Sequence, residues 1–382
     1  MIIKNVSHGV AIGGYAVYVH LPFCRVHCTY CPFAISTDLS QQNAYTDALI
    51  REIRSRLNGE EIESIYLGGG TPSRTSIENL QRVADELRRG GRPRSPSAAQ
   101  AAPEFSIEAN PEDITPDSLA AWRDLGINRV SIGVQSFDDV ELAAIGRIHN
   151  AQQARDAVAM TVATGGRTSL DLILGLPHQT RHSFERTLDE AIALGVGHLS
   201  LYMLDLEEGT PLQVQVERGR VRVADDELIA SLYQRAVTKL EAAGLAQYEV
   251  SNFARSGEEC IHNLRYWHRG EYFGFGMAAH SFINEERFAN TRNIRDYIAD
   301  PEHARDFSEL LGDDERKREQ LFLGLRQARG MYYEELIRLC GQEASEWIER
   351  GLRDGWLRQS GERVAFTSSG FLLSNDYISQ LF

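Results

Sequence analysis

The sequence predicts an α/β protein in which helices cover a parallel sheet. Short apolar runs rich in β-branched residues alternate with longer helical patterns, and this alternation repeats from residue 15 to residue 251. Repeated strand–helix units form parallel strands, arranged either as an open sheet or as a barrel. With 382 residues, of which 42% are hydrophobic and 25% charged, the chain can form one large domain and a smaller one.

Predicted strands and helices follow one another along the chain. The strands are residues 15–21, 64–68, 105–109, 129–134, 169–175, 198–204 and 247–251. The helices are residues 40–58, 75–89, 115–125, 138–145, 150–163, 181–194 and 225–243. A segment rich in Gly, Pro, Ser and Ala at 90–103 predicts a surface loop. In a barrel, the working face lies at the carboxyl ends of the strands.

The pattern changes after about residue 305, which predicts two domains, 1–304 and 305–382. Helical stretches at 314–327, 332–340 and 343–353 precede two short strands, 356–360 and 363–367, and a last helix. This order predicts a small winged-helix-like domain, a fold that binds DNA in some proteins and serves as a lid or docking module in others. The net charge of −14 argues against nucleic acid as a partner.

Cysteine usage and hydropathy predict a cytoplasmic protein with reduced thiols. No basic segment followed by an apolar run opens the sequence, so no signal peptide is expected. No apolar stretch approaches the roughly 18 residues of a transmembrane helix. The five cysteines are an odd number, with three tightly clustered, unlike a secreted disulfide framework.

The clustered cysteines are Cys24, Cys28 and Cys31, in a C-x3-C-x2-C pattern directly after the first predicted strand. Thiolates are soft ligands, suited to zinc or to an iron–sulfur cluster. Zinc requires a fourth ligand, which His20 or His27 could supply. A four-iron cluster held by three thiolates would instead leave one iron open for a substrate or cofactor. The residues alone leave both possibilities open.

The same spacing, with Tyr30 before the third cysteine, resembles the radical S-adenosylmethionine (radical SAM) superfamily. The resemblance implies a [4Fe–4S] cluster on Cys24, Cys28 and Cys31, with SAM chelated by the open iron. The segments SIEANP, NRVSIGVQSF, LAAIGRIHN, SLDLILGLPHQT and LSLYMLDLEEGTPL extend the match to the HemN/HemW branch over nearly the whole chain. That branch implies an incomplete (β/α) barrel and SAM contacts from Tyr18, Gly69, Gly70, Thr71, Glu108, Gln135, Arg147 and Asp171.

Two features separate the members of this branch. Enzymes of the HemN type carry a fourth cysteine two positions after the third, where this sequence has Phe33. The segment HNLRYW, which begins at His262, is similar to the H-N-x-x-Y-W motif of haem chaperones of the HemW type. This resemblance implies that His262 ligates haem, that Tyr266 and Trp267 pack on it, and that the haem is delivered to haem-requiring recipient proteins.

Two other functions stay open on the sequence alone. One is a radical SAM enzyme, either a coproporphyrinogen III dehydrogenase or a HemN-like C-methyltransferase. The other is a metal-dependent regulator that uses the C-terminal region on DNA, which the acidic charge disfavours. Cys260 and Cys340 are predicted to be small buried residues.

Overall fold

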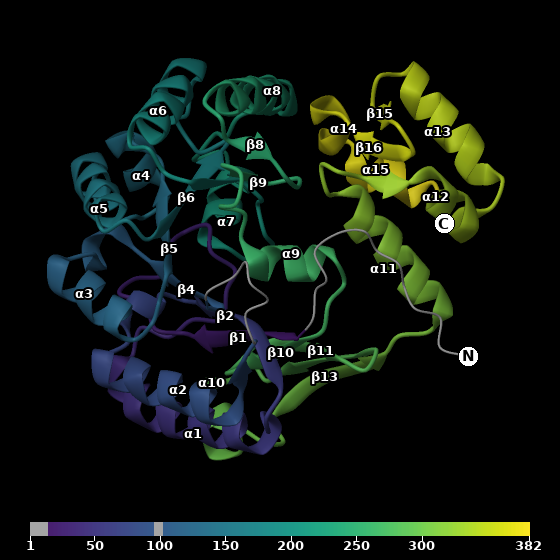
Figure 1. The fold of residues 1–382 in the computed structure, drawn as a ribbon. Coiled ribbons are helices and arrows are strands. Elements are labelled where there is room, and N and C mark those ends of the chain that lie inside the picture. The colour runs from purple at the N-terminus through teal and green to yellow at the C-terminus, as the bar shows by residue number, and fades with distance from the viewer. Residues whose placement is uncertain (1–13, 95–101) are drawn as a thin grey trace.

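The computed structural model describes residues 14–94 and 102–382; the predicted loop at 90–103 therefore lies partly outside the described residues. Six neighbouring parallel strands form its centre (Figure 1). They are β1 (Tyr15–Leu21), β2 (Glu61–Gly69), β4 (Glu104–Ala109), β5 (Arg129–Gln135), β6 (Arg167–Leu174) and β7 (His198–Met203). Each pairs with the next in chain order, which confirms the predicted α/β class and these six predicted strands.

The sheet continues beyond both ends of this parallel set without closing. On one side β10 (Tyr272–Phe275) pairs parallel to β1, and antiparallel strands follow: β11 (His280–Ile283), β12 (Glu286–Asn290) and β13 (Arg305–Leu310). On the other side lie β9 (Asn252–Ala254) and β8 (Ala246–Gln247), and β3 (Arg92–Pro93) pairs with β2. With β13 and β8 as its two edges, the sheet is an incomplete barrel, as predicted.

The predicted strand at 247–251 is wrong. Only Gln247 belongs to a strand, β8, and the chain then turns back into β9. The turn is closed by the Tyr248 N–H, which donates to the Asn252 carbonyl at 3.0 Å. The buried carboxylate of Glu249 accepts the Ser251 N–H at 3.0 Å, and the Val250 N–H donates to the Arg326 carbonyl at 3.0 Å, so this segment satisfies its polar groups without forming a longer strand.

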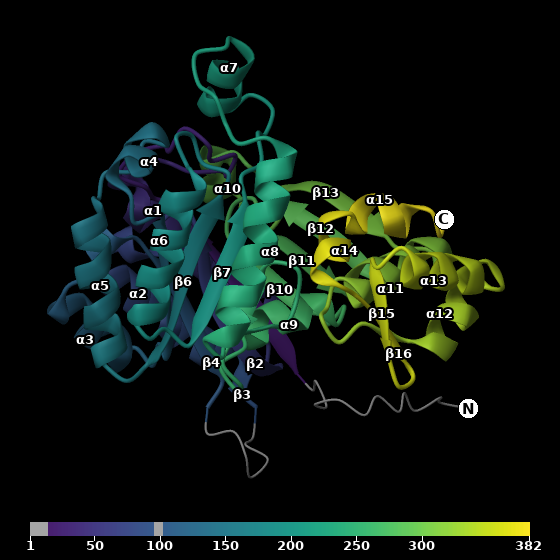
Figure 2. The ribbon, with the colours of Figure 1, turned by 90° about the horizontal axis from the view of Figure 1, so that it is seen from above.

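Helices cover the outer face of the sheet (Figures 1 and 2). Those predicted are α1 (Gln42–Arg56), α2 (Ile77–Gly90), α3 (Pro116–Asp124), α4 (Asp139–Ala144), α5 (Ala151–Ala163), α6 (Arg181–Ala193) and α8 (Asp226–Ala242). Three shorter ones were not predicted: α7 (Pro211–Glu217), α9 (Ile261–Trp267) and α10 (Ile294–Ala299). Polar side chains fix several starts; the Thr180 hydroxyl, for example, accepts the Ser183 N–H at 3.1 Å as an N-cap of α6.

The two faces of each parallel strand differ in polarity. In β1, Val17 and Val19 are fully buried in the apolar core beneath the helices, whereas Tyr18 points to a cavity inside the barrel. The same alternation in the other strands turns polar residues inward, among them Tyr66, Glu108, Ser131, Asp171, His198 and Ser200. The outer face therefore contributes to stability, and the inner face provides the polar groups of a binding site.

The C-terminal region contains α11 (Asp313–Leu325), β14 (Met331–Tyr332), α12 (Tyr333–Cys340), α13 (Glu343–Arg353), β15 (Leu357–Ser360), β16 (Arg363–Phe366), α14 (Ser368–Leu372) and α15 (Ser374–Ser379). Its strands form a separate sheet in the order β14-β16-β15. Beside this sheet, the rings of Trp347 and Tyr377 stack on each other, with centroids 4.6 Å apart. Because β13 still pairs with β12, we propose that the second domain begins after Leu310 rather than at residue 305. Among the described helices, none combines the length and apolar character needed to cross a bilayer.

Candidate cluster and cofactor site

A pocket of about 470 Å³ opens at the carboxyl ends of the parallel strands. Loops that follow β1, β2, β4, β5 and β7 line it, together with residues of β6 itself, as expected for the working face of a barrel. It collects ten of the residues singled out in the sequence: Cys24, Cys28, Cys31, Gly69, Gly70, Thr71, Glu108, Gln135, Arg147 and Asp171. Tyr18 and His262 lie elsewhere, in a second cavity deeper in the barrel.

The cysteine loop is held to the neighbouring loops by backbone and side-chain hydrogen bonds. The Thr29 N–H donates to the Ile145 carbonyl at 3.2 Å, and the Thr29 carbonyl accepts the Leu212 N–H at 2.9 Å. Within the pocket, Cys24 Sγ lies 3.2 Å from Thr71 Oγ1. Burial raises the pKa of the Cys24 thiol to about 11, so release of its proton depends on a bound cation.

The three thiols line one pocket and are the kind of ligand that an iron–sulfur cluster takes. Within the described residues, no three Cys, His, Asp or Glu side chains converge as the ligands of one ion would. A four-iron cluster needs one thiolate on each of several irons, so its ligands stand further apart. The Arg147 guanidinium, with Nη1 3.8 Å from Cys28 Sγ, can balance the cluster's negative charge.

Glycines at the end of β2 let this strand approach the cysteine loop. A Cβ on Gly70 would lie 2.5 Å from the Pro22 carbonyl oxygen and 3.0 Å from Cys24 Sγ. Gly69 has a φ of 115°, and its N–H donates to Glu108 Oε2 at 3.1 Å. The glycines therefore let the end of β2 lie against the cysteine loop, which side chains would prevent.

Two carboxyl groups, Glu108 and Asp171, stand in the pocket wall, and neither forms an ion pair with another described residue. Burial, with the nearby Asp171 second, raises the pKa of Glu108 to about 7. Burial also raises the pKa of Asp171 to about 6, although the Ser131 hydroxyl donates to it at 3.2 Å. Such carboxylates favour a ligand with positive charge and hydroxyl groups. SAM has a sulfonium, an ammonium and two ribose hydroxyls, so the pocket's chemistry fits it.

These raised pKa values predict how stability depends on pH when SAM is absent. Because folding raises both values, the folded protein binds protons more tightly than the unfolded chain. The stabilisation that these two groups contribute is therefore complete below about pH 4 to 4.5. That contribution is lost as the pH rises through about 6 to 7. Each unit by which folding raises a pKa corresponds to about 1.4 kcal/mol in the free energy of unfolding. Urea unfolding of SAM-free protein at several pH values measures the slope, and Glu108→Gln should flatten it; an unchanged slope would contradict the assignment.

Several residues around the predicted set were missed. Arg147 Nη2 donates to Asn110 Oδ1 at 2.7 Å and to the Gly133 carbonyl at 2.6 Å, so Asn110 orients the guanidinium. Tyr66 donates its hydroxyl to Glu108 Oε1 at 3.0 Å. The sequence did contain a signal for Asn110 and Tyr66. Polar residues at alternate positions along a buried strand, and at the position just after it, face the barrel interior.

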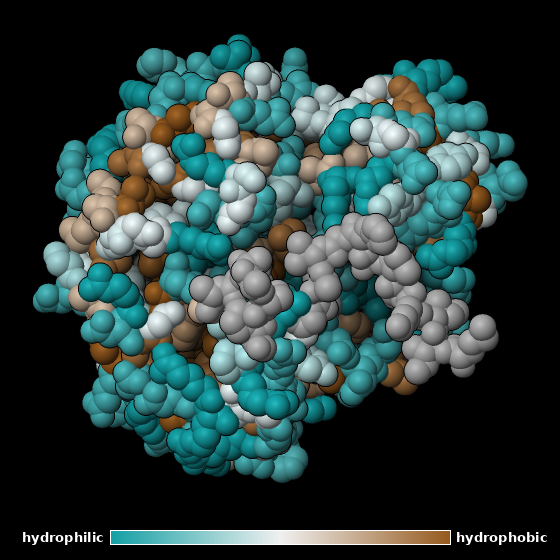
Figure 3. Space-filling model, viewed as in Figure 1, coloured by the Kyte–Doolittle hydropathy of each residue, from teal (hydrophilic) through white to brown (hydrophobic). Residues whose placement is uncertain are grey.

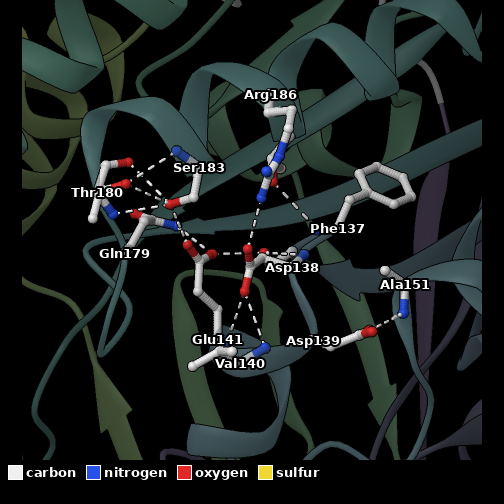
Figure 4. A network of polar contacts seen from close by, with 12 residues as sticks. Phe137, Asp138, Asp139, Val140, Glu141, Ala151, Gln179, Thr180, Ser183 and Arg186 are labelled. Atoms are coloured by element: carbon white, nitrogen blue, oxygen red, sulfur yellow. Dashed lines mark hydrogen bonds and ion pairs between the residues drawn. The ribbon is translucent and has the colours of Figure 1, made fainter.

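A buried network behind the pocket holds the loops after β5 and β6 together (Figure 4). At its centre is Glu141, whose carboxylate accepts hydrogen bonds from Ser136 at 2.6 Å, Ser183 at 2.5 Å and Gln179 at 3.2 Å. The network adjoins Gln135, a pocket residue with a φ of 68° that ordinary side chains rarely adopt. The loops are therefore rigid enough to hold this unfavourable backbone conformation.

His262 lies at the opposite end of the barrel from the pocket mouth. It belongs to α9, which covers the amino ends of the strands and lies near the viewer in Figure 1. The side chain is 1% exposed, and both ring nitrogens are engaged: Nδ1 lies 3.0 Å from Ser64 Oγ and Nε2 2.9 Å from the Tyr266 hydroxyl. The adjoining cavity holds about 180 Å³, below the range of about 300–1,000 Å³ typical of ligand pockets.

The pocket that holds the cysteine loop, called here the upper pocket, carries an exposed apolar rim at its mouth. We call this set the mouth rim; its members are Val26, Phe33, Ile148, Tyr202 and Met203. Phe33 is 61% exposed. By contrast, the face at the other end of the barrel is mostly hydrophilic, with small hydrophobic patches (Figure 3). Exposed apolar side chains gathered around a pocket indicate a binding surface.

Comparison with known proteins agrees with this fold and site. The Radical SAM superfamily profile matches residues 18–191, which include the cysteine loop and the parallel strands up to β6. Coproporphyrinogen III oxidase (HemN) from Escherichia coli has the same fold, with a TM-score of 0.81 and 23% identity over 97% of this chain and 90% of that one. The fold and the cysteine loop thus define a radical SAM protein, whose cofactors are a [4Fe–4S] cluster and SAM.

Relatives identify the family more closely. The heme chaperone HemW of Bacillus subtilis is 34% identical over 94% of this chain and 97% of its own length. HemW of Mycobacterium tuberculosis is 35% identical over 96% and 94%, respectively. A mouse mitochondrial relative, radical S-adenosyl methionine domain-containing protein 1, is 37% identical over 84% of this chain and 74% of its own. The chain belongs to the HemW family of radical SAM proteins.

Proposed function

We propose that this protein binds haem and delivers it to haem-requiring recipient proteins, with the cluster and SAM held in the upper pocket. The observation that carries the proposal is the similarity to heme chaperones over almost the whole of both chains. Phe33, in place of the further cysteine of HemN-type enzymes, favours the same function. The free thiols fit a reducing compartment, and we place the protein in the cytoplasm.

We propose the mouth rim as the surface that receives haem. Haem is a flat, largely apolar macrocycle, and the mouth rim supplies exposed apolar and aromatic side chains next to the cluster loop. His262, the histidine that the motif implicates, is enclosed in this structure. Direct ligation of haem iron by His262 requires both of its hydrogen bonds to break and α9 to move away from the barrel.

An anaerobic haem titration of the cluster-reconstituted protein, followed by Soret absorbance, tests the proposal. We expect saturable binding, followed by transfer to an apo-haem protein added in excess. Phe33→Ser should weaken haem binding by about 1–2 kcal/mol, roughly tenfold, because an exposed phenylalanine loses the area that it would bury against haem. Phe382→Ser, which changes another exposed phenylalanine far along the chain, is the matched control.

Each outcome has a distinct meaning. Absence of saturable binding contradicts haem delivery altogether. Binding that is indifferent to Phe33 contradicts only its placement at the mouth rim. Decarboxylation of coproporphyrinogen III, or transfer of a methyl group from SAM, would instead assign the protein to the enzymes of this branch.

A further inference from the structure

The buried His262 is connected to the SAM pocket through the interior of the barrel. Its ring stacks on Tyr66, with centroids 5.0 Å apart and planes 28° from parallel. Tyr66 in turn donates its hydroxyl to Glu108 Oε1 at 3.0 Å, and Glu108 lines the pocket. Glu108 therefore touches the pocket on one side and, through Tyr66, the α9 helix on the other.

The position of His262 is itself fixed from three directions. Ser64, two residues before Tyr66 on the same face of β2, bonds Nδ1. Tyr266, one turn further along α9, bonds Nε2 and packs edge-on against the imidazole, with centroids 4.9 Å apart. The backbone N–H of His262 donates to Glu104 Oε1 at 3.1 Å. An imidazole held so firmly leaves Tyr66 little freedom to turn its hydroxyl away from Glu108.

We propose that His262 is a positioning residue for SAM: it holds Tyr66 against Glu108 and so sets the carboxylate for SAM binding. The motif that begins at His262 then shapes the cofactor site from the far end of the barrel. This role concerns SAM affinity and does not rest on haem delivery. It requires only the contacts of α9, β2 and β4 in the closed barrel.

The electrostatic surroundings of Glu108 provide a readout that general destabilisation does not change. The hydrogen bond from Tyr66 lowers the pKa of Glu108, in opposition to burial and to Asp171, which raise it to about 7. Loss of that bond should raise the pKa further, so that Glu108 ionises only at higher pH. The titratable groups that interact with Glu108 from neighbouring elements are Tyr18, Tyr66, Asp171, Tyr202, Tyr266 and Cys31.

The test is the dissociation constant of SAM, measured from pH 5 to pH 9 on cluster-reconstituted protein. In the wild type, affinity should rise with pH as Glu108 ionises. Tyr66→Phe keeps the ring and removes the hydroxyl, and it should move the midpoint upward by about one pH unit, weakening binding about tenfold below the midpoint. His262→Ala should move it in the same direction. In the Tyr66→Phe background, His262→Ala should add little, because both changes remove one interaction.

His198→Ala is the matched control. His198 is also buried, lines the same cavity and sits between a serine and a tyrosine, with Ser169 Oγ at 2.6 Å and the Tyr248 hydroxyl at 2.8 Å. An equal midpoint shift in His198→Ala would overturn the proposal, as would a wild-type affinity that does not vary with pH. So would a His262→Ala protein that binds SAM normally. If His262→Ala fails to fold, the Tyr66→Phe shift alone decides whether this contact sets SAM affinity.

Discussion

Replacement of Cys28 by serine is expected to abolish cluster binding. A serine hydroxyl stays protonated near neutral pH and is a hard ligand, whereas iron–sulfur clusters are held by thiolates. With two cysteines left in the loop, the reconstituted protein should lose its iron and sulfide and the broad visible absorption of the cluster. SAM binding should weaken with it, because the open iron of the cluster chelates SAM in radical SAM proteins.

Cys340→Ser is the matched control. Cys340 ends α12 in the C-terminal region and does not line the upper pocket. The control should retain full iron content after reconstitution. Equal loss in both variants would indicate general thiol oxidation, and full iron content in Cys28→Ser would contradict the assignment of the cluster to this loop.

Replacement of Arg129 by methionine is expected to destabilise the fold by about 3–5 kcal/mol, since it removes the buried partner of the Glu104 carboxylate and leaves it only the longer contact with Arg167 at 3.5 Å. Arg129 is 1% exposed, and its Nε donates to Glu104 Oε2 at 2.9 Å. Its Nη2 donates to the carbonyls of Glu258 and Glu259 at 2.9 and 3.0 Å, which fixes the segment before α9. The free energy of unfolding from urea denaturation measures the loss.

A second change in the same protein isolates the cause. Glu104→Gln in the Arg129→Met background removes the poorly compensated charge and should recover part of the lost stability. Arg316→Met, which breaks an exposed pair with Asp313, should cost less than about 1 kcal/mol. Equal losses in the buried and exposed pairs would contradict the role assigned to Arg129.

The sequence predicted the parallel strands well because each alternates apolar and polar residues over a buried length, as Val17, Tyr18 and Val19 do in β1. The cysteine loop followed from its place after the first strand, whereas the other pocket residues followed from the resemblance to the HemN/HemW branch. The strands β10 to β13 were missed: β10, β11 and β12 are short, and the partner that joins them to the parallel sheet, β1, lies far away along the chain. The burial of His262 could not be read from its motif either, because it depends on Ser64 of a distant strand.

The pairing of β1 with both β2 and β10 has a consequence for synthesis of the protein on the ribosome. The cysteine loop is complete once residue 31 has been made, but β10 follows only at residues 272–275. At about 5–20 residues per second, translation of the intervening chain takes on the order of tens of seconds. During that time β1 has an unpaired edge. A chain that stalls before β10 is therefore expected to aggregate, and translation rate becomes a determinant of yield.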